Sequence, residues 1–226
     1  MADFSDIIRG MNWGYLLEIA YNIIPALLSI VVHETCHGLA ALAMGDRTAK
    51  RQGRLSLNPL RHIDPFGLLM LVVFKIGWAK PVSVDMRNFR DPKRGMAVTA
   101  LAGPASNFVL AALSMFAYGL LAVPLYGGEI GTAVLKMLGL SAYINISLGL
   151  FNLIPFPPLD GSKVLFALLP GRTYMKLMRY ERYGMIMLVA IVFGLSRIGI
   201  SPVGAAAEFV FDKFTVLARL GAGLTG

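Results

Sequence analysis

Long apolar stretches are the feature of this sequence that most constrains its fold. A helix needs roughly 20 mostly apolar residues to cross a hydrocarbon core of about 30 Å. Four stretches meet this requirement or nearly meet it: 15–44, 96–125, 130–154 and the shorter 183–198. A fifth apolar run, 203–220, carries four charged residues, and we expect an interfacial or poorly inserted helix there. Only 15% of the residues are charged, against about 25% in a soluble domain, so the sequence predicts an all-α polytopic membrane protein with four to five transmembrane helices.

Positive charge is concentrated in two segments between the apolar stretches. Residues 45–95 hold eleven of the 21 Lys and Arg residues, and residues 162–182 hold five. The turn near Gly127 has none before Lys136. Because Lys and Arg collect in cytoplasmic loops, both basic segments are predicted to be cytoplasmic and the turn at Gly127 to lie outside. The net charge of +8 therefore indicates orientation, and we expect no nucleic-acid binding because no basic run exceeds two residues.

The longer basic segment contains more than a plain loop. Residues 66–74 form an apolar run that is too short to span a membrane, and residues 77–85 have a β-like composition. We expect a small re-entrant or interface-hugging segment here, with one or two strands on the cytoplasmic side. Irregular backbone at membrane depth needs protein or water to satisfy its polar groups, so a water-filled cavity is expected to open on this side.

The first apolar stretch contains the pattern His-Glu-x-x-His, formed by His33, Glu34 and His37. On a helix, residues four apart share a face, so both imidazoles can bind one zinc ion while the adjacent Glu reaches a water molecule on the metal. With three histidines in 226 residues, the pattern arises by chance in about one chain in a thousand. Ionisable groups inside an apolar span are costly, which favours a functional role for all three side chains.

A catalytic zinc ion needs a third protein ligand and an open position for water. Among the candidates are His62, just beyond the first span, and Asp160, which follows the proline-rich end of the third span. The first and third spans run in the same direction, so His37 and Asp160 both approach the cytoplasmic end of the molecule. Asp160 would also suit the N-cap of a helix that starts near Ser162. Spacing alone leaves its role as ligand or as cap open.

Three motifs in order resemble the site-2 protease family of intramembrane zinc metalloproteases. They are the His-Glu-x-x-His pattern, the sequence Ala-Gly-Pro-Ala-Ser-Asn at 102–107 in the second span, and the sequence from Asn to Asp-Gly at 152–161. The resemblance covers about residues 20–195 and is strongest to short members that lack PDZ and nucleotide-sensing domains. We therefore expect a single membrane-embedded metalloprotease domain over residues 1–226, in which the first three stretches are core spans and the last two are peripheral helices.

The resemblance also implies a set of site residues. It implies one zinc ion per chain with three protein ligands, which are His33, His37 and Asp160. Glu34 would be the catalytic base, Asn152 would hold the substrate or stabilise the oxyanion, and Asn107 would lie near the active site.

The implied activity is hydrolysis of peptide bonds in or near transmembrane segments of membrane protein substrates. We expect a multi-pass protein of a prokaryotic cytoplasmic membrane, in contact with the lipid bilayer and with its active site near the cytoplasmic side. One alternative is a membrane metal-binding or transport protein, although the inverted repeats typical of transporters are not evident in the sequence. The other is a proteolytically inactive family member, which would have no need of Glu34.

Overall fold

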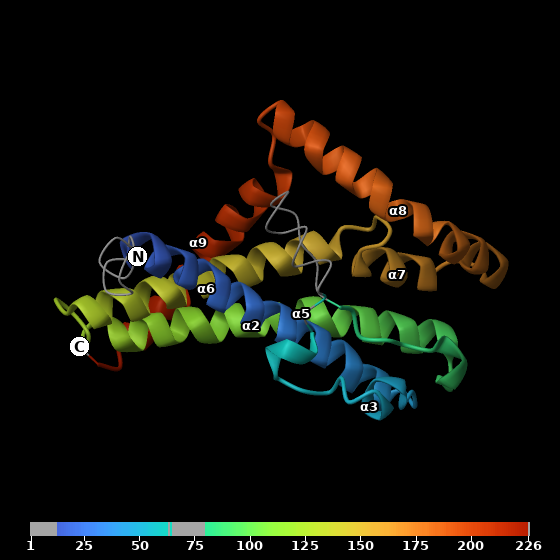
Figure 1. Cartoon of the computed structure of the whole chain (residues 1–226), viewed down its shortest axis with the longest axis horizontal. Helices are drawn as coiled ribbons and strands as arrows, with labels where there is room; N and C mark the ends of the chain where they lie inside the picture. The colour runs from blue at the N-terminus through green and yellow to red at the C-terminus, as the bar shows by residue number, and fades with distance from the viewer. Residues whose placement is uncertain (1–12, 63, 65–79, 226) are drawn as a thin grey trace, which may run out of the picture.

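The protein is helical over most of its length in this computed structural model, which describes residues 13–62, 64 and 80–225 (Figure 1). The helices are α2 (Trp13–Ala43), α3 (Thr48–Arg51), α5 (Pro92–Ala122), α6 (Glu129–Leu153), α7 (Asp160–Ala167), α8 (Gly171–Arg197) and α9 (Pro202–Ala222). Two short 3-10 turns, η1 (Pro59–Arg61) and η2 (Met86–Asn88), lie in the connecting segments. No strand occurs in the described ranges, in agreement with the predicted all-α class.

Three helices coincide with the first three predicted spans. α2, α5 and α6 each contain a stretch long and apolar enough to cross a membrane. Local sequence explains where α5 begins: the Asp91 carboxylate accepts hydrogen bonds from the first backbone N–H groups, and Pro92 occupies a position whose N–H would have no helical partner. The three helices expected here are confirmed within a few residues at each end, as candidate membrane spans.

The two C-terminal helices differ from the predicted bounds. The predicted span 183–198 is only the second half of α8, because residues 171–182 are rich in charge and hydropathy detects only apolar helices. The chain then bends by 79° before α9, where Ser201 caps the new helix and Pro202 cannot continue the old one. The described residues thus hold three candidate spans, or up to four if this bent pair counts as one.

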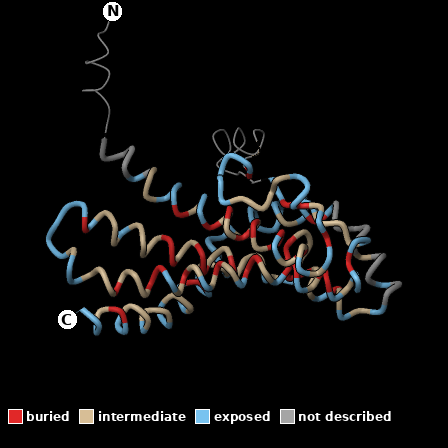
Figure 2. The backbone as a smooth tube through the Cα atoms, turned by 90° about the horizontal axis from the view of Figure 1, so that it is seen from below, coloured by how far each residue is buried: buried red, intermediate tan, exposed pale blue. Residues whose placement is uncertain are grey.

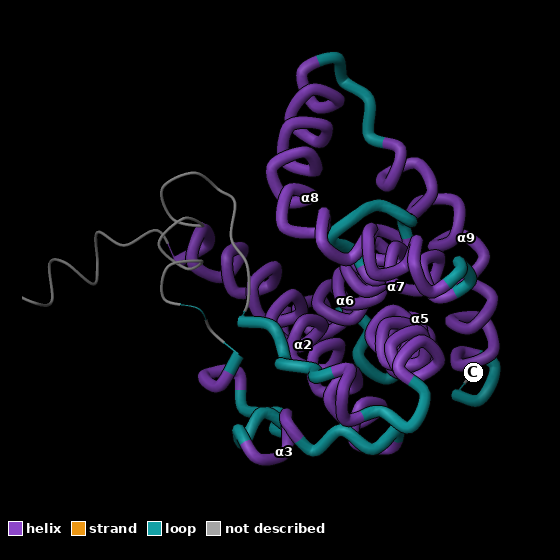
Figure 3. The backbone as a smooth tube through the Cα atoms, turned by 90° about the vertical axis from the view of Figure 1, so that its right-hand side faces the viewer, coloured by secondary structure: helices purple, strands orange, loops and turns teal. Residues whose placement is uncertain are grey.

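Helix α5 lies at the centre of the bundle. It contacts α2, α6, α7 and α9, and Figure 3 shows it enclosed by these helices, while α8 projects away from them. Small residues allow the close approach: a Cβ atom on Gly119 of α5 would collide with the backbone of Ala218 in α9. Small side chains at helix crossings are typical of membrane bundles, where packing rather than hydrophobic burial drives association.

The interior of the bundle is more polar than that of a soluble protein. Figure 2 shows buried positions along the facing sides of the helices, and several of them are polar. Buried polar side chains on α2, α5 and α6 include Ser29, Asn107, Ser114, Ser141 and Asn145. Large apolar side chains meanwhile point outward, for example Ile24 on α2, Val109 on α5 and Phe193 on α8. This inside-out distribution suits a protein surrounded by lipid.

The β-like segment is not a strand where the structure describes it. Residues 66–74, predicted to be re-entrant, and residues 77–79 lie outside the described residues. The rest, residues 80–85, is irregular extended chain, which we call the cover segment. Two of its N–H groups donate to side chains, Val82 N to Glu34 and Asp85 N to Asp46, and Lys80 N donates to the backbone oxygen of His62, which is not in a strand. The expectation of a strand is therefore wrong for residues 80–85.

Candidate metal centre and active site

One helix and the start of another bring the predicted metal ligands together. His33 and His37 lie one turn apart on α2, and both are buried. Asp160 is the first residue of α7, placed there by the turn that follows α6, and it is only 6% exposed. The N-cap of α7 is Leu159, so the capping alternative for Asp160 is wrong. Its carboxylate is free to face α2 because no capping bond holds it.

The three side chains point their ligand atoms at one another. The Nε2 atoms of His33 and His37 are 2.9 Å apart. Asp160 Oδ2 lies 3.2 Å from His33 Nε2 and 3.1 Å from His37 Nε2. The two imidazole rings stand at 89°, edge to face. Among the described residues this is the one group of three or more His, Cys, Asp or Glu side chains close enough to share a metal ion.

The hydrogen bonds on the far side of each ring test whether this set fits a cation. His37 Nδ1 lies 2.6 Å from the backbone oxygen of Thr99, which can only accept, so this nitrogen carries the proton. His33 Nδ1 lies 2.6 Å from Asn107 Oδ1. With protons on both Nδ1 atoms, two Nε2 lone pairs and a carboxylate oxygen converge. Such a cluster is repulsive unless a proton or a metal ion lies between these atoms, and two His nitrogens with one carboxylate oxygen form a donor set typical of catalytic zinc.

A glycine on α5 makes room for the two imidazoles. A Cβ atom on Gly103 would lie 2.7 Å from His33 Cε1 and closer still to the ring of His37. Gly103 belongs to the second sequence motif, and because it has no side chain the two imidazole rings can lie directly against α5. Its neighbour one turn on, Asn107, is fully buried and bonds to His33. The motif at 102–107 therefore forms the wall behind the ligands.

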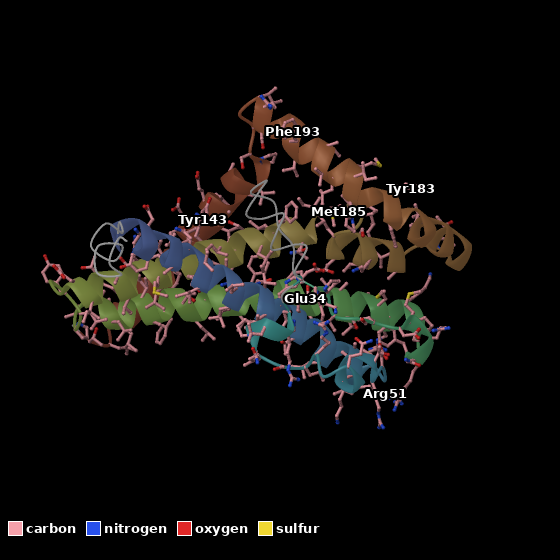
Figure 4. All side chains as sticks on the ribbon, in the orientation of Figure 1. Glu34, Arg51, Tyr143, Tyr183, Met185 and Phe193 are labelled. Carbon is pink, nitrogen blue, oxygen red and sulfur yellow. The ribbon has the colours of Figure 1, made fainter. Side chains whose placement is uncertain are left out.

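Glu34 lines the cavity next to the two histidines, whereas Gly103 and Asn107 lie behind them. It is half-buried, and its Oε2 accepts a hydrogen bond of 2.8 Å from Val82 N of the cover segment. Among the described residues its second carboxylate oxygen has no hydrogen-bond partner. Figure 4 shows Glu34 in the middle of the molecule where α2 passes α5, whereas Arg51 on α3 points away from the body.

A buried carboxylate fixes the cover segment against the end of α2. Asp46 is fully buried and accepts hydrogen bonds from Thr48, from Asp85 N and from the Asn88 amide. Burial by itself raises the pKa of Asp46, but these hydrogen bonds outweigh it and hold the pKa below its ordinary value of 3.8. Asp46 is therefore ionised at neutral pH and joins α2 to the segment that touches Glu34.

A cavity of about 370 Å³ opens beside the three ligands. It is bounded by α2, the cover segment, the start of α5, the end of α6 and α7, and its lining includes His33, Glu34, His37, Val82, Asn152 and Asp160. Asn152 is half-buried, and its Nδ2 donates to Leu148 O within α6. A cavity is thus present beside the site, as expected, with space for water.

Two further candidates lie outside the ligand cluster. His62 is buried, but its Nε2 donates to Ser56 O in the loop after α3 and its side chain is not part of the three-residue group. Asn107 lies behind His33 rather than in the cavity lining. Sequence reasoning missed Val82 and Asp46, because a backbone N–H has no residue signature and a lone Asp after a helix looks like an ordinary turn residue.

Comparison with known proteins agrees with this geometry. Residues 123–197 match the model of peptidase family M50. The chain is 37% identical over 175 residues to YwhC of Bacillus subtilis, a match that covers 76% of this chain and 79% of that protein. The chain belongs to peptidase family M50. This membership confirms the resemblance to the site-2 proteases and, at family level, the class of intramembrane metalloprotease.

Other M50 relatives are more distant. Rip2 of Mycolicibacterium smegmatis is 28% identical over 194 residues, covering 83% of this chain and 71% of that protein. Rip2 of Mycobacterium tuberculosis strain H37Rv is 30% identical over 170 residues, covering 73% and 63%. The names of YwhC and of both Rip2 proteins class them provisionally as zinc metalloproteases. No solved structure matches the chain at a significant level.

Proposed function

We propose that this M50 protein is a zinc metalloendopeptidase that cleaves membrane protein substrates in or near their transmembrane segments. The observation that carries the proposal is the convergence of two histidine nitrogens and one carboxylate oxygen, all buried, beside a cavity that also contains a carboxylate. His33, His37 and Asp160 would hold one zinc ion per chain. The whole chain would act as a single membrane-embedded domain over residues 1–226.

His33, His37 and Asp160 would hold the zinc ion, which would supply Lewis-acid chemistry for water activation near neutral pH. The remaining chemistry belongs to the side chains of the chain itself. Glu34 Oε2 is held by Val82 N, so the other carboxylate oxygen, which has no hydrogen-bond partner in the described part of the chain, is available to take a proton from the attacking water. The same group then returns the proton to the leaving amine.

Asn152 is suited to contact the substrate. One N–H of its amide is used within α6 by Leu148 O, which fixes the orientation of the side chain. The second N–H and the carbonyl oxygen remain for a peptide in the cavity, either to bind it or to stabilise the oxyanion. Asn107 would support the site from behind by bonding to His33 rather than by touching substrate.

The surroundings fit a membrane substrate and a cytoplasmic-side site. Large apolar side chains exposed on α2, α5 and α8 suit contact with lipid and with substrate helices. The cavity lies toward the ends of α2 and α6 that lead into the two basic segments, 45–95 and 162–182. By the positive-inside rule this end faces the cytoplasm, and we propose a location in a prokaryotic cytoplasmic membrane.

The test combines metal content with cleavage of a single-span model substrate by purified protein. Wild type and Glu34→Gln should each hold about one zinc ion, and only the wild type should cleave. Asp160→Ala should lose most of the metal, whereas the matched control His62→Ala, which removes another buried histidine, should keep it. Full zinc in Asp160→Ala would refute the ligand set. Zinc in the wild type with no cleavage of any membrane substrate would refute the protease and favour a transporter or an inactive relative.

A further inference from the structure

A chain of hydrogen bonds runs from His33 into the bundle, away from the cavity. His33 Nδ1 lies 2.6 Å from Asn107 Oδ1. Asn107 Nδ2 donates to Asn145 Oδ1 at 2.8 Å, and Asn145 Nδ2 donates to Ser141 O at 2.8 Å. Both asparagines are 0% exposed. The chain thus links α2, α5 and α6 where the structure shows both amides out of contact with solvent, and Asn145 has no part in the proposed mechanism.

The direction of every bond in this chain follows from its inner end. A backbone carbonyl can only accept, so Ser141 O requires the NH2 group of Asn145 to face it. The oxygen of Asn145 must then face Asn107 and accept from its NH2 group. That leaves the oxygen of Asn107 facing His33, whose Nδ1 must therefore be the donor. A second carbonyl, Ser29 O, lies 3.3 Å from Asn107 Nδ2 and favours the same orientation.

The two imidazoles differ in how their protons are fixed. His37 faces the backbone oxygen of Thr99 directly, and that oxygen cannot change its role. His33 faces a side-chain amide, which could present either its oxygen or its NH2 group if it were free to turn over. If the Asn107 amide turned over, its Oδ1 would face Asn145 Oδ1, and both oxygens can only accept. Its NH2 group would face His33 Nδ1, which would then have to accept a hydrogen bond. The proton would then move to His33 Nε2, the atom that points at His37 and Asp160.

We propose that Asn145 is a positioning residue that, through Asn107, holds the proton on Nδ1 of His33 and so keeps the Nε2 lone pair directed at the metal. The inference rests on the proposed function in one respect, that His33 is a ligand. It adds a residue from α6 that touches neither metal nor substrate but determines whether one ligand can bind.

Two substitutions at the same position separate this role from packing. Asn145→Leu keeps the number of side-chain heavy atoms and the branching at Cγ, adds some volume, and removes both hydrogen bonds. Asn145→Asp keeps both, because burial disfavours the ionised form and an uncharged carboxyl group donates through O–H to Ser141 O while accepting from Asn107. Asn145→Ala removes the same bonds without adding volume and should behave as Leu does. A packing role would rank the three variants by how well their volume fits the site, so that Leu and Ala differ from each other, whereas the proposed role gives Leu and Ala the same loss and tolerates only Asp.

The first readout is the 15N spectrum of the histidine rings in metal-free protein, which distinguishes protonated Nδ1 from protonated Nε2. The chain has only three histidines, so the His33 signals can be assigned with a single substitution. The second readout is zinc affinity by competition with a chelator. Asn145→Leu should lose the Nδ1–H signature of His33 and about tenfold or more in zinc affinity, and Asn145→Asp should stay near the wild type in both.

Ser114→Ala is the matched control. It removes a hydroxyl that contacts Ser141 Oγ in the same polar interior but lies off the path to His33, so both readouts should be unchanged. The proposal would be overturned if Asn145→Leu kept the wild-type tautomer of His33 and the wild-type zinc affinity. It would also be overturned if Asn145→Asp lost as much zinc affinity as Asn145→Leu. If the wild type itself bound no zinc, the ligand set would be refuted, and the 15N comparison would still decide whether Asn145 controls His33.

Discussion

Replacing Gly103 with Ala should separate metal binding from folding. A Cβ atom at this position would lie 2.7 Å from His33 Cε1, whereas ordinary contact begins at 3.4 Å, so α5 and the imidazoles must part by at least about 0.7 Å. Zinc sites tolerate about 0.2 Å in ligand distances. Ala is also a better helix former than Gly by about 1 kcal/mol, so the substitution should increase the intrinsic stability of helix α5. We expect Gly103→Ala to fold and to lose most of its zinc and all of its cleavage activity.

The control for this substitution is Gly139→Ala on α6. A Cβ there would meet only Tyr118 Cε2 at 3.9 Å, which is ordinary contact, while the change in helix propensity is the same. Metal content by elemental analysis and unfolding by circular dichroism should be measured on both variants and the wild type. If Gly103→Ala bound zinc as tightly as the wild type, the close approach of α5 to the imidazole rings would not be needed for metal binding.

Three further substitutions test the surroundings of the site and the packing of the bundle. Asp46→Asn replaces one accepting oxygen with an NH2 group that faces another N–H group. The free energy of unfolding, measured by chemical denaturation, should fall by about 1.5–3 kcal/mol. The cleavage rate should also fall, while the zinc content stays unchanged. Because the folded pKa of Asp46 lies below its ordinary value, its contribution is complete above pH 3.8 and declines as the pH falls further, so wild type should lose more stability than Asp46→Asn on acidification. Asn152→Leu should retain zinc and lose about 10² to 10³ in cleavage rate if its amide stabilises the oxyanion; an unchanged rate would contradict that role. Gly119→Ala should destabilise the packing of α5 on α9, because the new methyl group meets the backbone of Ala218; unchanged thermal unfolding would show that the helices can separate without cost.

Much of the fold could be predicted from local sequence. The spans at α2, α5 and α6 follow from apolar length alone, because backbone groups inside a bilayer must be satisfied within a helix. The first half of α8 could not be found in this way, since its charged residues conceal a helix from hydropathy. The strand expected at residues 80–85 failed for another reason. Its composition suits a strand, but the N–H groups of Val82 and Asp85 find partners in Glu34 and Asp46, which are 48 and 39 residues away in sequence.

The same division holds for the candidate site. The pair of histidines and the adjacent Glu34 were evident because all three lie on a single helix, where spacing fixes geometry. The choice between ligand and cap for Asp160 could not be made from spacing, because it depends on where the turn after α6 directs the chain. Asn145 carried no signal at all, since its role consists of the direction of a hydrogen bond between helices.

By itself, then, the sequence determined three long apolar helices and the placement of His33 and His37 on one face of α2, because these depend only on hydropathy and on the period of one helix. The tertiary structure alone decided what stands around them: Gly103 as the gap behind the rings, Val82 as the partner of Glu34, and Asn145 as the inner end of the hydrogen-bond chain. The physical reason is that each of these roles requires two segments to meet at a defined distance and angle, and no local property of either segment encodes that meeting.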